Sequence, residues 1–122
     1  MANRPRKSFG QRSEAQAAAH LSAGGYEIVE TNWHHTVGEL DIIARKDGVW
    51  VFVEVRARHS HTTEDALASI NNKKRVRVVA AAHAYLSEHD LDDVPWRIDV
   101  VAIAVPRYGD PVVEHVEDAF DW

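Results

Sequence analysis

The chain contains no cysteine, a single methionine, and only 6 glycines and 4 prolines among its 122 residues. The absence of cysteine excludes disulfide bonds, a thiol nucleophile and a metal site built on thiolates. No apolar run is long enough to span a membrane, and the basic N-terminus lacks the apolar stretch of a signal peptide. We therefore expect a cytoplasmic protein without a membrane partner.

The composition is that of a folded domain with an uneven distribution of charge. Apolar residues make up 45% of the chain and charged residues 27%, which argues against disorder, a collagen-like repeat and a coiled coil. The net charge is −5, but residues 1–87 carry 12 Lys and Arg against 9 Asp and Glu, whereas residues 88–122 carry 2 against 10. A mildly basic body can thus lie behind an acidic C-terminal region, so the overall charge does not exclude nucleic acid as a partner.

Local patterns predict one α/β domain with a mixed sheet. Ser8 and Gln11 have the spacing of a capping box, and two glycines follow the helix that they begin. We assign the domain to residues 9–117, between a flexible basic N-terminus (1–8) and an acidic tail (118–122). The expected order is helix 9–23, strands 26–33, 40–44 and 49–57, helix 64–88, strand 96–105 and a short edge strand 112–116.

The first helix carries an acidic residue where an apolar one is expected. Glu14, Ala18 and Leu21 are spaced i, i+4 and i+7, which is typical of the face that a helix turns toward the core. A glutamate on this stripe either reaches solvent from the end of the helix or has a function. Glu14 is therefore a candidate functional residue.

The strand at residues 49–57 has two different faces. One face is apolar throughout, whereas the other begins with aromatic residues and continues with Glu54, Arg56 and Arg58. A solvent-exposed face is more commonly polar along its whole length. The change from apolar to ionic side chains indicates that this strand runs into a polar cleft.

The turn that precedes this strand predicts which residues face one another. Asp47-Gly48 favours a two-residue hairpin turn, which places Asp41 opposite Glu54 and Glu39 opposite Arg56. A four-residue loop would place Glu39 opposite Glu54 and keep Asp41 on the same face, whereas a three-residue loop would separate these groups. With an even loop, three carboxylates crowd one patch of the hairpin.

Such crowding is relieved by basic partners or by a bound cation. Arg56 and Arg58 could form a structural network with the carboxylates, in which Glu39 pairs with Arg56. A hard ion such as Mg²⁺, which prefers oxygen ligands, could occupy the patch instead. The spacing leaves both interpretations open.

Other ionic groups have simpler interpretations. Asp99 is expected to be the partner of a buried or basic group, and the histidines at 34–35 and 59–61 lack the spacing of a zinc site. The basic run at residues 73–77 lies on a predicted helix, where it forms either a solvated face or a set of contacts to DNA phosphates.

Two ordered segments, GELDIIA at 38–44 and VFVEVRAR at 51–58, resemble the YraN-type family of small bacterial proteins. The resemblance covers roughly residues 8–104 and keeps their order. It also includes Gly10, Glu14, Ala17, Leu21, Gly25, Tyr26, Asn32, Trp33, Lys74, Ala81, Ala82, Tyr85, Leu86, Asp99, Val100 and Val101.

The resemblance implies a restriction-endonuclease-like fold, distantly similar to archaeal Holliday-junction resolvases, with a nuclease motif of the PD-(D/E)XK type. Asp41 and Glu54 would then be metal-binding carboxylates for Mg²⁺ or Mn²⁺. Glu14 would match the glutamate that the first helix adds to the site, and it would complete the metal shell directly or through water. Arg56 stands where the motif has lysine. A guanidinium cannot act as a base, although it can orient water or stabilise charge on a phosphate.

The predicted function is hydrolysis of DNA, including branched or structured DNA, by a divalent-metal-dependent endonuclease with Asp41, Glu54, Arg56 and Glu14 as catalytic residues. Contacts to DNA are expected from Arg58, Lys73, Lys74 and Arg77. The alternatives are a non-catalytic module that binds nucleic acid or a protein partner, and an interaction domain whose charged cluster only stabilises the hairpin. Because resolvase-like enzymes act as symmetric dimers, the resemblance also leaves a homodimer open.

Overall fold

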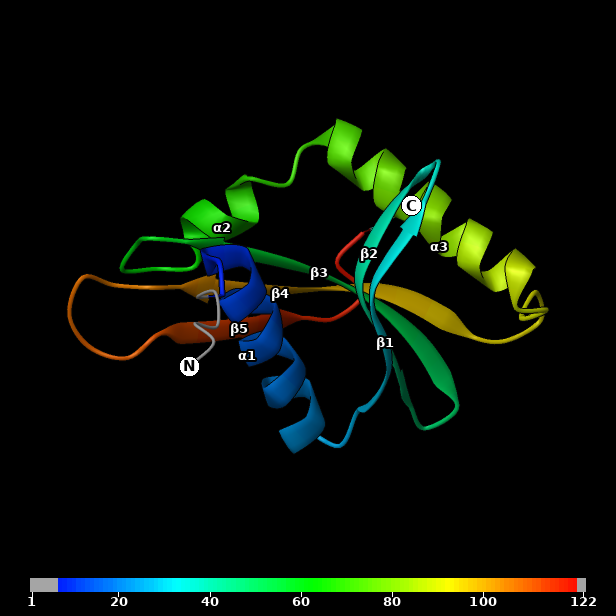
Figure 1. The fold of residues 1–122 in the computed structure, drawn as a ribbon, viewed down its shortest axis with the longest axis horizontal. Helices are drawn as coiled ribbons and strands as arrows, with labels where there is room; N and C mark the ends of the chain where they lie inside the picture. The colour runs from blue at the N-terminus through cyan, green and yellow to red at the C-terminus, as the bar shows by residue number, and fades with distance from the viewer. Residues whose placement is uncertain (1–6, 121–122) are drawn as a thin grey trace, which may run out of the picture.

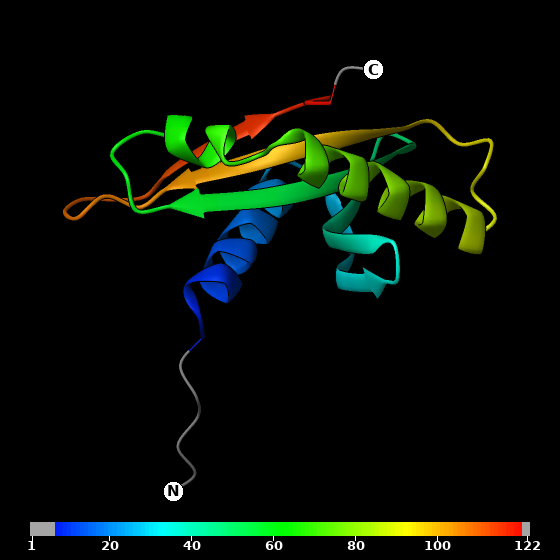
Figure 2. The same cartoon turned by 90° about the horizontal axis from the view of Figure 1, so that it is seen from above.

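The computed structural model describes residues 7–120, which form one five-stranded sheet between two layers of helices. The strands lie in the order β1-β2-β3-β4-β5, so β1 and β5 are the edges. Figure 2 shows β3, β4 and β5 side by side in green, gold and orange-red. Figure 1 shows α2 and α3 above the strands and α1 below and in front of them. The elements are α1 (Phe9–Ala23), β1 (Glu27–His35), β2 (Gly38–Lys46), β3 (Val49–Arg58), α2 (Glu64–Ala68), α3 (Asn72–Glu88), β4 (Trp96–Ala104) and β5 (Val112–Val116). The predicted α/β class, the mixed sheet and the α-β-β-β-α-β order are confirmed.

Helix α1 begins and ends where its capping signals predict. The Ser8 amide donates to Gln11 Oε1 at 2.9 Å, and the Gln11 amide donates to Ser8 Oγ at 3.1 Å, which completes the capping box. Of the predicted flexible segment 1–8, residues 1–6 lie outside the described residues. The predicted inward stripe is wrong by about one position, since Ser13, Ala17 and Leu21 are the buried residues and Glu14 is half-buried. The buried face of α1 includes Ser13 and Ala17 rather than Glu14 and Ala18. Small side chains on this face let the helix approach the sheet more closely than a glutamate would.

The β2–β3 hairpin has the predicted two-residue turn. Asp47 and Gly48 both have positive φ angles, of 52° and 79°, as a turn of this twist requires. Pairing runs from Lys46↔Val49 to Ile42↔Val53, which is the expected register.

The predicted single helix at 64–88 is wrong, because the chain breaks it into α2 and α3 at residues 69–71. The Asn71 side chain accepts a hydrogen bond from the Lys74 amide at 2.9 Å and so begins a new helix. Ser69 Oγ donates to the Ala66 carbonyl and ends the preceding one. Local side-chain bonds therefore compete successfully with a continuous helix.

Two apolar layers cover the sheet. Val51 and Val53 face α1, whereas Phe52 faces α3, as strand alternation requires. The α3 layer contains Leu40, Ile43, Phe52, Val78, Ala81, Ala82, Tyr85, Leu86, Ile98, Val100 and Phe120. The α1 layer contains Ala17, Leu21, Tyr26, Ile42, Ala44, Val51, Val53, Ala57, Val101 and Ile103. Within the described residues, no helix is long and apolar enough to cross a membrane.

The C-terminal part of the chain is held by Asp99. This residue is fully buried on β4 and binds Arg97 and His115, which confirms its predicted structural role. It also accepts a hydrogen bond from the Asp118 amide at 3.0 Å, and Phe120 is buried in the α3 layer. Of the predicted acidic tail 118–122, residues 118–120 thus pack against the sheet, and residues 121–122 lie outside the described residues.

Candidate functional site

The β2–β3 hairpin opens into a pocket just beyond the last paired residues. Pairing stops at Ile42↔Val53, and the next side chain, that of Asp41, accepts a hydrogen bond from the Val55 amide at 2.8 Å. A carboxylate therefore replaces a backbone carbonyl in the ladder, and the two strands separate. The pocket has a volume of about 240 Å³ and is lined by residues of α1, β2, β3 and α3.

This pocket brings together most of the predicted site. Six of the residues that line it are charged: Glu14, Asp41, Glu54, Arg56, Arg58 and Lys74. Lys73 and Arg77 line an adjacent pocket instead. The fold thus places residues that are up to 60 positions apart in the sequence, from Glu14 to Lys74, around one pocket.

The centre of the site is the carboxyl pair of Asp41 and Glu54. Glu54 is only 2% exposed. Burial, together with the negative charge of Asp41, raises the pKa of Glu54 to about 8. Burial also raises the pKa of Asp41, opposed by the hydrogen bond from Val55 and the charge of Lys74. With its pKa raised to about 8, Glu54 is the member of the pair that holds a proton near neutral pH.

Two cations approach this pair without bonding to it closely. Lys74 Nζ lies 3.5 Å and Arg56 Nη1 lies 3.6 Å from Glu54 Oε1. The rest of the Arg56 guanidinium faces the α2–α3 break, where Nε donates to Ser69 Oγ at 2.9 Å and Nη2 to the Ser69 carbonyl at 3.3 Å. The basic run at residues 73–77 predicts a DNA contact for Lys74 but not its place beside Glu54. Only its inclusion in the family resemblance marked it.

The predicted pair of Glu39 and Arg56 is wrong. Glu39 is exposed, and its Oε1 lies 3.1 Å from Nδ1 of His34 on β1. Glu39 pairs with His34 across β1 and β2 because β2 has already left β3 at that point. The third carboxylate near the site is therefore Glu14 rather than Glu39.

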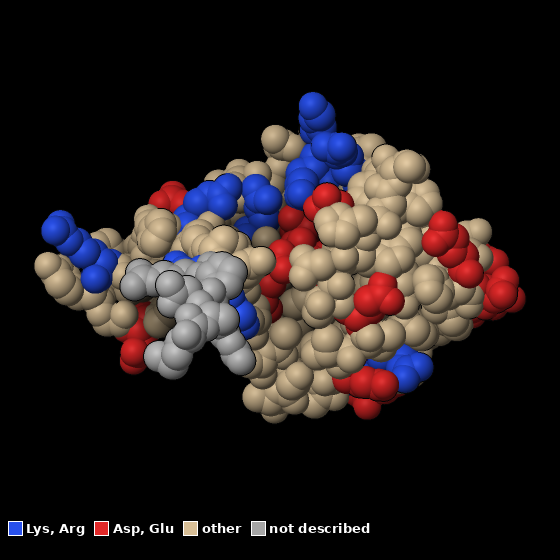
Figure 3. Space-filling model, viewed as in Figure 1, with Lys and Arg blue, Asp and Glu red and all other residues tan. Residues whose placement is uncertain are grey.

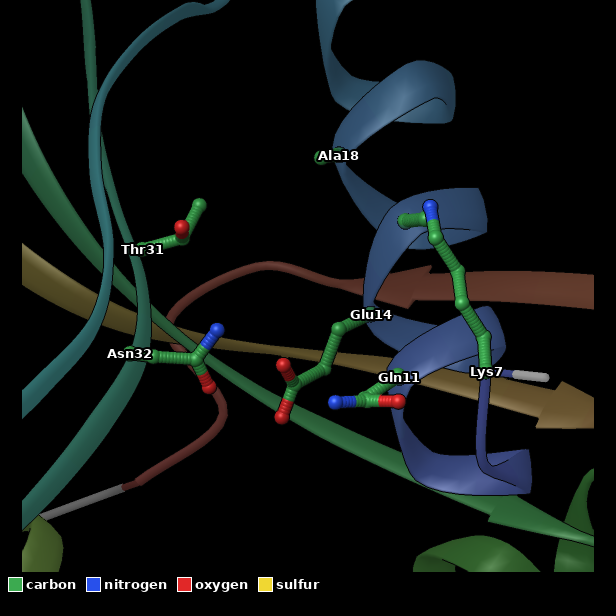
Figure 4. Close-up of a pocket in the computed structure, with 7 residues that line it drawn as sticks. Lys7, Gln11, Glu14, Ala18, Thr31 and Asn32 are labelled. Atoms are coloured by element: carbon green, nitrogen blue, oxygen red, sulfur yellow. The ribbon is translucent and has the colours of Figure 1, made fainter. Parts of the chain in front are cut away.

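Glu14 extends from α1 into the space between that helix and β1 (Figure 4). Burial, followed by the charge of Asp41, raises the pKa of Glu14, and a hydrogen bond from Asn32 opposes the shift. The side chain borders both the site pocket and a second pocket of about 250 Å³. Among residues 7–120, however, no three His, Asp or Glu side chains are grouped closely enough to hold one ion directly.

The donor set nevertheless suits a small divalent ion. Mg²⁺ keeps several of its waters in proteins and is commonly held by one or two carboxylates. Asp41 and Glu54 supply two adjacent carboxyl groups. Glu14 is a further carboxyl group that lines the same pocket.

A basic surface borders the acidic pair. Figure 3 shows Lys and Arg side chains over the start of α3 and along the neighbouring edge, with acidic side chains in the hollow beneath them. The adjacent pocket, of about 250 Å³, is lined by Arg56, Ser69, Asn71, Lys73, Lys74 and Arg77 and contains no carboxylate. Two of the histidines have structural contacts: His59 stacks on Phe9 with 4.3 Å between ring centroids, and His35 bonds to Glu88.

The fold and the site define an α/β protein with an acidic pair, half-buried Asp41 and buried Glu54, on an opened hairpin beside a basic helix end. The chain belongs to the uncharacterised protein family UPF0102, whose model matches residues 13–103, and the resemblance to the YraN-type family is thereby confirmed. It is 45% identical to a UPF0102 protein of Roseiflexus castenholzii over 118 residues, which make up 95% of each chain. It is 45% identical to a UPF0102 protein of Chloroflexus aurantiacus over 100 residues (81% of each chain), and 40% identical to one of Geotalea uraniireducens over 115 residues (94% of this chain, 91% of the relative).

Proposed function

We propose that this protein is a divalent-metal-dependent endonuclease that hydrolyses phosphodiester bonds in DNA. One observation carries the proposal: the adjacent carboxyl groups of half-buried Asp41 and buried Glu54 lie in a pocket with a basic border. A purely structural ion pair would be expected to bond more closely than the distances of 3.5 and 3.6 Å to Glu54. The electrostatic arrangement favours an added cation in the hollow and a polyanion across its border.

Asp41 and Glu54 would hold Mg²⁺ or Mn²⁺, which when bound lowers the pKa of a coordinated water and neutralises charge on the phosphate. Asp41 is kept in place by the Val55 amide, so one of its oxygens has a defined position in the pocket. The fixed guanidinium of Arg56 adds positive charge beside the acidic pair. Glu14 orients water from the α1 side.

Arg58, Lys73 and Arg77 would bind the phosphodiester backbone on either side of the pocket. Such contacts position DNA without reading its sequence, so we expect cleavage that depends on the shape of the substrate rather than on its bases. Branched or flapped DNA is the substrate class that the family resemblance favours. A homodimer would allow two strands to be cut in one complex.

The test is a cleavage assay on linear, flapped and four-way DNA with Mg²⁺ or Mn²⁺. We expect metal-dependent cutting that Asp41→Asn abolishes. Asp47→Asn is the matched control, because Asp47 is exposed in the hairpin turn at a positive φ that asparagine also tolerates. Equal cutting by the wild type and Asp41→Asn would contradict the proposed site.

A second candidate function is a module that binds DNA without cutting it. The tethering of Arg56 to Ser69 favours this alternative, because Arg56 then contributes a fixed charge and cannot accept a proton. Metal-independent DNA binding by the wild type, with no cutting of any substrate, would support the binding module over the nuclease.

A further inference from the structure

We infer that Lys74, which α3 brings into the pocket, stabilises the phosphate during cleavage as a catalytic residue. This inference rests on the proposed function and names the group that carries it out. Arg56 is then a positioning residue, since its guanidinium connects β3 to the α2–α3 break. The two side chains differ in how far each can move toward a bound phosphate.

Arg56 is held in one place. Two of its nitrogens donate to Ser69, at 2.9 Å to the hydroxyl and 3.3 Å to the carbonyl, and only Nη1 points toward Glu54. Its side chain is 21% exposed. A phosphate in the pocket could draw this guanidinium closer only by breaking its bonds to Ser69.

Lys74 has the opposite character. Its backbone is fixed, because its amide donates to Asn71 in the first turn of α3. Its side chain is 38% exposed, and its Nζ lies 3.5 Å from Glu54 Oε1. Lys74 lines the site pocket, the basic pocket beside it and a third pocket that contains Glu39. The ammonium can therefore turn from Glu54 to a phosphate oxygen by rotation about its own bonds.

The approach of α3 to the hairpin makes this placement possible. Gly38 of β2 lies directly under α3, and a Cβ atom there would stand 2.7 Å from the Arg77 carbonyl. Arg77 is one helical turn beyond Lys74. The close contact thus brings the first turns of α3 to the pocket.

The chemical step is hydrolysis of one ester bond. The oxygen of a water forms a bond to phosphorus, and the bond from phosphorus to the leaving oxygen breaks, with its electron pair on that oxygen. The attacking water gives up one proton to solvent, and the leaving oxygen takes one up from solvent. Lys74 keeps its own protons and donates a hydrogen bond to a non-bridging oxygen, where negative charge accumulates.

Lys74→Met tests this role, because methionine keeps an unbranched apolar stem and removes the ammonium. We expect kcat on the best DNA substrate to fall about 100-fold, as for the loss of one donor to a developing oxyanion, with KM changed much less. Arg75→Ala is the matched control on the same turn, since Arg75 is exposed and contacts Phe120 rather than the pocket. It should retain the kcat of the wild type.

A second measurement does not depend on activity. Because the ammonium competes with a divalent ion for Glu54, Lys74→Met should increase the thermal stabilisation produced by a fixed concentration of Mn²⁺, whereas Arg75→Ala should not. In the Lys74→Met background, Arg56→Lys should restore part of the lost kcat, because a lysine at position 56 is free of the bidentate bonds to Ser69.

The outcomes separate the two claims. If the wild type cuts DNA and Lys74→Met cuts it equally fast, the inference is overturned and the proposed function stands. If the wild type cuts no substrate with either metal, both are overturned. An increase of KM alone in Lys74→Met would show a contact that only binds DNA, which also overturns the catalytic role.

Discussion

Glu54 and Asp99 are both buried acids, but their surroundings differ. Asp99 accepts hydrogen bonds from Arg97 at 2.9 Å and from the Asp118 amide at 3.0 Å, and it bonds to His115 at 2.7 Å. Both of its carboxylate oxygens therefore have hydrogen-bond partners within the protein. Glu54 has its two cationic neighbours at 3.5 and 3.6 Å and a second carboxyl group beside it. Asp99 therefore stabilises the sheet. Burial of Glu54 instead lowers the stability of the fold, and a bound cation would offset that loss.

The raised pKa of Glu54 predicts the direction of a pH effect. Its pKa is about 8 in the folded protein against an ordinary value of 4.5, so the folded state keeps a proton that the unfolded chain releases in between. The free energy of unfolding must then fall as the pH rises through this window. We expect urea denaturation in EDTA to show a fall on the order of a few kcal/mol between about pH 5 and pH 8 that Glu54→Gln lacks.

Glu64→Gln on α2 is the matched control, because Glu64 is exposed and its side chain meets water in both states. It should follow the wild-type profile. A Glu54→Gln profile parallel to that of the wild type would show that Glu54 is already ionised in the folded protein at pH 5.

Helix α3 is the element whose position decides the composition of the site. Gly38 lets it approach β2, and the Asn71 cap sets where it begins. The interruption before it also places Ser69 within reach of Arg56. A continuous helix through residues 69–71 would remove both the cap and the bond to Arg56.

Gly38→Ala should push α3 away from the hairpin. The added Cβ would meet a backbone carbonyl at 2.7 Å, which cannot move without the helix. We expect a loss of about 1–3 kcal/mol in the free energy of unfolding and faster hydrogen exchange of the α3 amides. Gly10→Ala is the matched control, because a Cβ there meets only Ser8 Oγ at 3.9 Å within α1, and alanine favours a helix. Unchanged exchange in α3 after Gly38→Ala would contradict the close contact.

Asn71→Ala should weaken the start of α3. Its side chain satisfies the Lys74 amide at 2.9 Å, and the loss of such a cap typically costs about 1 kcal/mol. Thermal denaturation should detect this loss, whereas Asn72→Ala, which changes the exposed neighbour inside the helix, should leave the stability within about 0.5 kcal/mol of wild type. Equal effects of the two substitutions would argue against the cap.

The whole molecule combines a net charge of −5 with a basic border around one acidic hollow. Exposed acidic side chains also lie in the loop after α3 and on β5. A stabilising effect of an added cation must therefore be assigned to the Asp41–Glu54 site by substitution. Stabilisation of the whole fold is the simplest measure, because an ion that binds only the folded protein raises its stability in proportion to the logarithm of its concentration.

Mn²⁺ should raise the melting temperature of the protein by several degrees. At about 100 times its Kd, a ligand adds roughly 2.7 kcal/mol, which is readily detected in a domain of this size. Mn²⁺ should bind at least as well as Mg²⁺ to an all-oxygen site. Asp41→Asn should abolish the shift, and Asp47→Asn should keep it. If millimolar Mn²⁺ leaves the wild-type curve unchanged while Asp41→Asn destabilises the protein, the carboxylates are partners of ion pairs.

Rules that act between neighbours in the chain were sufficient for part of this structure. The capping box of α1 and the Asp47-Gly48 turn depend on residues a few positions apart, so both can be predicted from the sequence alone. Because the turn sets the register, it also brought Asp41 and Glu54 together correctly. The order of elements and the short edge strand β5 followed from the same local patterns.

The remaining features depend on contacts between distant segments. The rotation of α1 and the separation of β2 from β3 before Glu39 are set by how the layers pack. The arrival of Lys74 beside Glu54 requires α3 to lie against Gly38, and no local signal encodes that distance. Side-chain charge and spacing thus predicted that Asp41 and Glu54 meet on the hairpin, but they wrongly placed Glu39 with them. Packing across the sheet decided which cations meet them, because a helix takes its position from the apolar surface it covers.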